Sequence, residues 1–274
     1  MDEWPQYLHG ADNNAVANDT VVGPPRHVQW ISGPAWTRSH MGAASIASMV
    51  SAGGRLFTIE DRETAENPYL PSKWKLIARD AFNGITLWTM DYPSWDPITV
   101  YIKTFHAQPQ RRLAAIGDIL YCTPGLDAPV TALNAATGAK IRTYSGTKQT
   151  QEFAYHEGTL YVVVGDRMRE QRKTTQKTAK GKKRGKAKQQ PEAEQKPAKE
   201  EIEFNGYGFA NHLYNPSWPT ADVPKNTIIA IDAKTGKERW RCGKIDRYTG
   251  CSMALKGEKL VYQSANGVFC LDTR

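Results

Sequence analysis

Residues 228–240 read IIAIDAKTGKERW: an apolar run, an Asp, three further residues, a Gly and, four residues after the Gly, a Trp. The same motif occurs as LIARDAFNGITLW at residues 76–88 and as TALNAATGAKIR at residues 131–142. A fourth copy, VFCLDTR at residues 268–274, stops within the motif. A motif that recurs along a chain indicates a repeat architecture, in which each copy forms one supersecondary unit.

The chemistry of the motif predicts a tight turn between two strands. An Asp or Asn side chain accepts hydrogen bonds from backbone N–H groups two or three residues further on, and the following Gly supplies a position with φ > 0. Because a catalytic group is needed once and these residues recur in every unit, we assign them to turn closure rather than to catalysis. The predicted turn residues are Asp80, Gly84, Asn134, Gly138, Asp232, Gly236 and Asp272.

Each motif follows a Gly and a short apolar-aromatic run, as in Gly158-Thr159-Leu160-Tyr161. The runs are rich in Val, Ile, Leu, Thr and Tyr, which is typical of strands, and no stretch of twelve residues keeps a helical apolar period. Four-stranded antiparallel blades arranged radially would bury such strands. We therefore predict an all-β fold, a β-propeller, in which Trp88 and Trp240 wedge between neighbouring blades.

The repeat resembles the pyrroloquinoline-quinone (PQQ) repeat, whose consensus runs roughly G-x-L-Y/F followed by A-L-D-A-x-T-G-x-x-x-W. Residues 228–240 match it almost completely, whereas the first copy has Asn83 where Thr is usual, and the second has Asn134 for Asp and Arg142 for Trp. The opening WPQYLHG at residues 4–10, with Trp30 after it, is similar to the start of BamB-like propellers. The resemblance covers residues 4–165 and 226–274 and implies the fold more strongly than the function.

The number of copies predicts a partial ring. Propellers of this family usually have seven or eight blades of about 40–50 residues, and the 274 residues hold three recognisable units, a fourth that is cut short and an N-terminal segment. We therefore interpret residues 1–274 as about half of a propeller. An open arc would expose a blade face at each end, so we expect the native chain to continue beyond Arg274.

The formal net charge of +8 resides in one insertion. Residues 167–200 hold thirteen Lys and Arg and four Glu, so the other 240 residues carry 23 basic and 24 acidic side chains. This segment has no aromatic residue and is predicted to be disordered. It is either a solvated insertion without a dedicated ligand or a contact for a polyanion such as nucleic acid or anionic lipid. The loop at 201–224, which contains aromatic residues, is expected to fold back onto the propeller or to line a binding surface.

The cysteines and the termini bear on the compartment. Cys122 and Cys270 lie in apolar runs and are expected to be small core residues, whereas Cys242 and Cys251 flank a short loop and could either pair or remain free. No run of about 18–20 apolar residues and no signal peptide are visible. A periplasmic or otherwise extracytoplasmic location is implied by the resemblance alone.

Two functions from different classes fit these observations. The first is a non-catalytic scaffold of the bacterial envelope that binds a protein partner or a further domain of the same chain. The second is the N-terminal part of a dehydrogenase that depends on PQQ and calcium, as the resemblance allows. No segment matches the channel loops that hold this cofactor, so no catalytic, cofactor or metal residue is assigned. One weak ligand candidate remains, His40, which lies among small residues.

Overall fold

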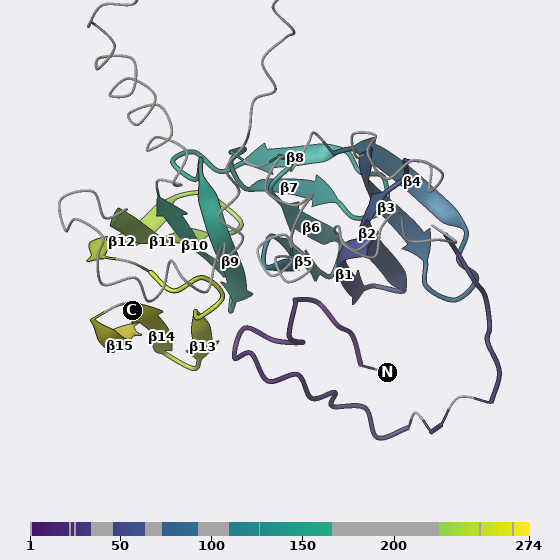
Figure 1. Cartoon of the computed structure of the whole chain (residues 1–274), viewed down its shortest axis with the longest axis horizontal. Coiled ribbons are helices and arrows are strands. Elements are labelled where there is room, and N and C mark those ends of the chain that lie inside the picture. Colours follow the sequence, from purple (N-terminus) through teal and green to yellow (C-terminus); the bar gives the residue numbers. More distant parts are fainter. Residues whose placement is uncertain are drawn as a thin grey trace, which may run out of the picture.

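The computed structural model describes residues 2–33 without 22 and 25, 46–63, 73–92, 110–165 without 126, and 225–274 without 247 and 265. Strands make up nearly all of the regular structure in these ranges, and they form four antiparallel sheets in chain order (Figure 1). The predicted all-β fold is therefore confirmed, and the arrangement is that of consecutive propeller blades in an open arc.

Three sheets have four strands and the last has three, each sheet in simple sequential order. We number the sheets as blades 1 to 4 along the chain. Their strands are, in blade 1, β1 (Ile46–Ala52), β2 (Arg55–Asp61), β3 (Trp74–Asp80) and β4 (Thr86–Asp91); in blade 2, β5 (Leu113–Ile116), β6 (Ile119–Cys122), β7 (Thr131–Asn134) and β8 (Lys140–Thr143); in blade 3, β9 (Thr150–His156), β10 (Thr159–Gly165), β11 (Lys225–Asp232) and β12 (Glu238–Asp246); and in blade 4, β13 (Ala254–Lys256), β14 (Lys259–Ser264) and β15 (Gly267–Asp272).

Apolar cores lie between successive blades, because alternate residues of each middle strand face opposite neighbours. Phe57 and Leu76 of blade 1 pack with Leu120 of blade 2 in the first core. Equivalent cores join blade 2 to blade 3 and blade 3 to blade 4. The blades are thus held together mainly by apolar burial. The middle strands of blade 1 also bury an ion pair, between Arg79 Nη1 and Glu60 Oε1 at 2.7 Å.

The first strand of each blade lies at the inner edge of its sheet. In Figure 1, β1, β5, β9 and β13 surround the concave side of the arc, whereas β4, β8 and β12 lie on its outer side. The N-terminal segment runs along the concave side before it leaves the arc and returns to blade 1, where Trp30 bonds to Ala81 O. Four sheet edges and the start of the chain therefore meet in one place.

The structure tests the predictions about the cysteines, and the two predicted loop segments fall outside the described residues. Cys122 is buried as predicted, but Cys270 is exposed. The reason is that β15 has no fourth strand beside it and no following blade against it among the described residues. All four thiols are free, so Cys242 and Cys251 do not pair. The segments 167–200 and 201–224 lie outside the described residues.

Candidate functional site at the inner face

The inner face presents four backbone N–H groups at equivalent positions. Each belongs to the penultimate residue of a first strand, and each donates to the segment Trp4–Asn13, which we call the strap. The four bonds are Ser51 N to Trp4 O, Ala115 N to Pro5 O, Tyr155 N to Gln6 Oε1 and Leu255 N to Ala11 O, all at 2.8 Å. An inner strand edge carries unpaired donors, and the strap satisfies one of them in every blade.

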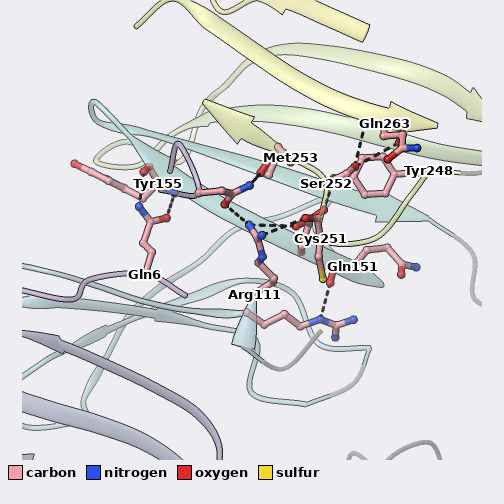
Figure 2. Close-up of polar contacts among 12 residues, drawn as sticks. Gln6, Arg111, Gln151, Tyr155, Tyr248, Cys251, Ser252, Met253 and Gln263 are labelled. Carbon is pink, nitrogen blue, oxygen red and sulfur yellow. Dashed lines mark hydrogen bonds and ion pairs between the residues drawn. The ribbon is translucent and has the colours of Figure 1, made fainter. Parts of the chain in front are cut away.

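Gln6 makes a two-way bond to blade 3. Its amide oxygen accepts from Tyr155 N, and its Nε2 donates to Tyr155 O at 3.0 Å (Figure 2). The side-chain amide thus pairs with the strand edge as a peptide unit of a neighbouring strand would. Gln6 is buried and both bonds are partly shielded from water, so leaving this amide unpaired would be costly.

Arg111, just before β5, is the centre of a polar cluster between blades 2, 3 and 4. Its Nη1 donates to Asn13 Oδ1 at 2.6 Å, and its Nη2 donates to Cys251 O at 3.1 Å. Its guanidinium also lies over the Tyr7 ring, 5.0 Å from the centroid, within the range of a cation–π contact. Figure 2 shows the side chain directed toward the loop before β13. One cation therefore links the strap to blade 4.

Glu152 of β9 supplies the negative charge of this cluster. Its Oε2 lies 3.9 Å from Arg111 Nη1 and has no hydrogen bond, whereas its Oε1 accepts from the Tyr248 hydroxyl. Burial raises the pKa of the Glu152 carboxyl, and Arg111 and Tyr248 oppose that rise. Burial together with the Glu152 charge raises the pKa of Tyr248 as well. The positive charge of Arg111 thus lies close to the carboxyl group of Glu152, and both side chains are buried.

The strap has a local fold that presents its polar groups to the blades. His9 N donates to Gln6 O at 3.0 Å, and His9 has a φ of 69°, so the chain turns tightly after Gln6. His9 Nε2 lies 2.8 Å from Asp2 Oδ2, and the His9 ring meets Trp4 edge to face at 5.1 Å. Asn13 then donates from Nδ2 to Met253 O at 2.8 Å. A cavity of about 10 Å³ remains beneath the strap, room for about one water molecule.

The residues around Arg111 do not fit calcium with PQQ. Calcium takes about six to eight oxygen ligands, and the oxygens that converge here are those of Asn13, Glu152 and the Cys251 carbonyl. The guanidinium of Arg111 already lies among them, and a second cation at the same place would meet its charge. Within the described ranges, no three His, Cys, Asp or Glu side chains gather in a way that could hold a metal ion.

The repeat residues lie at the outer corners of the blades, away from this cluster. Asp80 Oδ1 accepts from Phe82 N at 2.8 Å and from Asn83 N at 3.0 Å, and Gly84 has a φ of 74°. Asn134 with Gly138 and Asp232 with Gly236 have the same geometry. Asp272 lies at the end of β15, where the Arg274 side chain and backbone, and then Lys259, hold its pKa below its usual range.

The Trp positions contact the corner of the next blade. Trp88 Nε1 donates to Ala135 O at 2.9 Å, and Trp240 Nε1 donates to Thr273 O at 3.0 Å. Arg142, which replaces Trp in the second copy, donates from Nη1 to Thr235 O, whereas the equivalent corner carbonyl, Ala233 O, accepts from the Tyr144 hydroxyl at 2.6 Å. Trp30 takes this place on blade 1, with Nε1 donating to Ala81 O at 3.0 Å.

The sequence did not reveal the inner-face cluster, and His40 lies outside the described residues. Arg111, Glu152 and Tyr248 belong to no recurring motif, and they are far apart in the sequence. The sequence offered only a weak signal, a Glu directly before the short apolar run Phe153-Ala154-Tyr155. Among the residues that the structure describes, no helix has the length or apolar character needed to cross a bilayer.

No protein-family model matches the sequence, and no curated protein matches it. Among solved structures, the chain is similar to an acylaminoacyl peptidase from Pyrococcus horikoshii at 10% identity and a TM-score of 0.45, over 82% of this chain and 29% of that one. It is similar to a quinohemoprotein alcohol dehydrogenase from Comamonas testosteroni at 15% identity and 0.40, over 88% of this chain and 27% of that one.

BamB from Moraxella catarrhalis is a third similar structure, at 14% identity and a TM-score of 0.27, over 82% of this chain and 70% of that one. The chain thus spans less than a third of the length of the peptidase and of the dehydrogenase. Both groups named by the sequence resemblance, quinoprotein dehydrogenases and BamB, are represented. Similarities of this size carry no conclusion about activity, substrate or partner.

Proposed function

We propose that this chain is a non-catalytic binding scaffold of the bacterial envelope, which holds a protein or peptide on a rigid arc of blades. The observation that supports it is the polar cluster around Arg111 at the inner face. Arg111 bonds to Asn13 and to the Cys251 carbonyl and faces Glu152 at 3.9 Å, and Asn13 bonds to the Met253 carbonyl, so these groups engage one another and the loop before β13 rather than a reacting centre. A dehydrogenase would need free oxygen ligands and an available base at such a place.

The alternative, a dehydrogenase that uses PQQ and calcium, is tested with the full chain. Calcium chloride and PQQ are titrated into the protein in a calorimeter, and reduction of an electron-accepting dye is followed with an alcohol as substrate. We expect neither saturable heat nor dye reduction. Saturable binding at micromolar PQQ, with dye reduction that depends on calcium, would overturn the scaffold function.

The extracytoplasmic location is part of the same proposal and has its own test. Cells of the source organism are fractionated, and the protein is detected with an antibody raised against it. We expect the signal to follow markers of the envelope or periplasm. A signal confined to the cytoplasmic fraction would overturn the envelope location. The scaffold function would then still be tested by the PQQ titration.

A further inference from the structure

The four equivalent N–H donors form a repeated recognition element on the inner face. Their spacing is set by the blades, because each donor occupies the same register position in its strand, one residue before the hairpin turn. An exposed strand edge with donors in register is the kind of surface that binds extended peptides by main-chain hydrogen bonds. Here the four edges come from four sheets and are bridged by one segment.

The strap meets these donors as a bound peptide does. Three of its acceptors are backbone carbonyls, which any sequence could supply. The fourth is the Gln6 side chain, and Asn13 adds a second side-chain amide that bonds to both Met253 O and Arg111. Main-chain bonds of this kind contribute affinity, and the two amide side chains contribute selectivity for a polar pattern.

The connection of the strap to blade 1 allows it to leave the groove. In the described part of the connector, Val16, Val21, Val28 and Ile31 are exposed, and the contacts with blade 1 come from Gln29 and Trp30 near its far end. Trp30 fixes the far end of the connector at Gly84, independently of the strap. A segment tethered in this way has an effective concentration of about millimolar, and a peptide of sufficient affinity can compete with it.

We propose that the inner face of the arc is a groove for an extended peptide, and that the strap is its intramolecular, exchangeable occupant. The ligand is an extended peptide with a Gln and an Asn spaced as Gln6 and Asn13 are. In the resting protein the strap blocks the groove. This inference rests on the proposed scaffold function, for which it names the class of ligand.

The test uses the full chain with a protease site inserted between Gly23 and Pro24, two exposed residues of the connector. Cleavage leaves the strap held only by its contacts with the groove. A dye-labelled synthetic peptide with the sequence of residues 2–14 is then added, and its binding is followed by fluorescence anisotropy and native mass spectrometry. We expect saturable exchange into the cleaved protein and much weaker uptake by the uncleaved one.

Peptide variants test the contacts while the protein stays unchanged. Gln6→Ala and Asn13→Ala in the peptide should each weaken binding about ten-fold, since each removes two hydrogen bonds that are partly shielded from water. The matched control is Asp12→Asn, because Asp12 is exposed and its side chain accepts a hydrogen bond from Asn14 N of the same segment. Its affinity should stay within about two-fold of the parent peptide.

Three outcomes would overturn the inference. The first is that no labelled peptide enters after the cleaved fragment has dissociated while circular dichroism shows intact sheets. The second is that the chain unfolds on cleavage, which would make the strap an integral part of the fold. The third is that Asp12→Asn weakens binding as much as Gln6→Ala. None of these outcomes bears on the proposed scaffold function, which the PQQ titration tests separately.

Discussion

At the scale of the residue, the inner face depends on a buried guanidinium and a buried carboxylate. Arg111 and Glu152 have side-chain exposures of 8% and 2% and are 3.9 Å apart, so their attraction is only weakly screened by solvent. Their desolvation is costly, and the bonds to Asn13, the Cys251 carbonyl and Tyr248 offset it. The cluster therefore contributes to the specificity of the blade contacts more than to their strength.

The raised pKa of Glu152 predicts how stability depends on pH. The folded chain takes up the Glu152 proton more readily than the unfolded chain does, so from about pH 4.3 upward this group makes the free energy of unfolding fall as pH rises. The fall ends above the raised pKa, and its slope is at most about 1.4 kcal/mol per pH unit. Urea denaturation at a series of pH values should show this slope in the parent and not in Glu152→Gln.

Glu157→Gln is the matched control for this pH series. Glu157 follows the same strand but is exposed, with 77% of its side-chain surface accessible. Its curve should run parallel to that of the parent protein. If the Glu152→Gln curve also runs parallel to the parent, Glu152 does not exchange its proton on folding, and the assigned electrostatics of the cluster are wrong.

The four cysteines should differ in reactivity by burial. Cys122 lies in the core between blades 1 and 2, and burial raises the pKa of its thiol to about 12. Burial likewise raises the pKa of Cys251 to about 12, with Glu152 adding to the rise. In the native protein near pH 8, a thiol-specific reagent should modify exposed Cys270 first, and Cys122 and Cys251 only after unfolding. Cys270→Ser should remove the fast phase, and fast modification of Cys122 in that variant would contradict the burial assignment.

At the scale of the element, the blade corner is the unit that recurs. The Asp or Asn side chain closes the turn, the Gly takes a positive φ, and a Trp or Arg of the preceding blade packs on that Gly. Where Arg142 replaces the Trp, the corner carbonyl of Ala233 accepts from the Tyr144 hydroxyl, and Arg142 donates to the nearby Thr235 carbonyl. The corner thus joins a local turn to the packing of two blades, which explains why Gly recurs beside the Trp.

Gly138→Ala and Gly158→Ala separate two constraints on the corner Gly, its positive φ and its contact with the Trp ring. Gly158, in the turn between β9 and β10, has the first constraint without the second. Both residues have positive φ, 73° and 78°, so Ala is strained at either position. At Gly138 the new methyl group would also lie 2.8 Å from a Trp88 ring carbon, whereas at Gly158 it would meet nothing within 4 Å. We expect losses of about 2–4 kcal/mol at Gly138 and about 1–2 kcal/mol at Gly158, from guanidinium denaturation. Equal losses would mean that the Trp88 contact adds no constraint.

At the scale of the whole molecule, the fold is an arc with a nearly neutral body. Apolar cores join the blades in series, and the strap crosses all four inner edges as a single segment. The ladder between β10 and β11 runs from Thr159 and Asp232 to Gly165 and Asn226. The two ends of that hairpin lie opposite each other, so blade 3 does not need the sixty residues between them to set its register.

Deletion of residues 167–200 should therefore leave the folded body intact. The net charge would change from +8 to −1, because thirteen Lys and Arg and four Glu are removed. We expect the urea midpoint to shift little and the binding of the protein to heparin to fall sharply at low salt. A deletion variant that fails to fold would show that the segment contributes to the core. Unchanged heparin binding would place the polyanion contact elsewhere.

Local chemistry explains what could be predicted from the sequence. The turns at Asp80, Asn134 and Asp232 are closed by residues two to four positions away, and alternating apolar residues are sufficient to indicate strands. The all-β fold and the repeated blades therefore followed from the motif in residues 228–240 and its copies. Burial of Cys122 also followed, because its neighbours in the sequence form an apolar strand.

The inner face could not be predicted, because long-range contacts create it. Gln6 meets Tyr155 across 149 positions, Asn13 meets Met253 across 240, and Arg111 meets the Cys251 carbonyl across 140. None of these pairs has a fixed spacing, and their contact depends on how the blades pack. The exposure of Cys270 has the same origin, since burial of a strand residue requires a neighbouring strand and blade. Short-range hydrogen bonds thus set the blades, and their packing alone brings the strap, the four donors and Arg111 together.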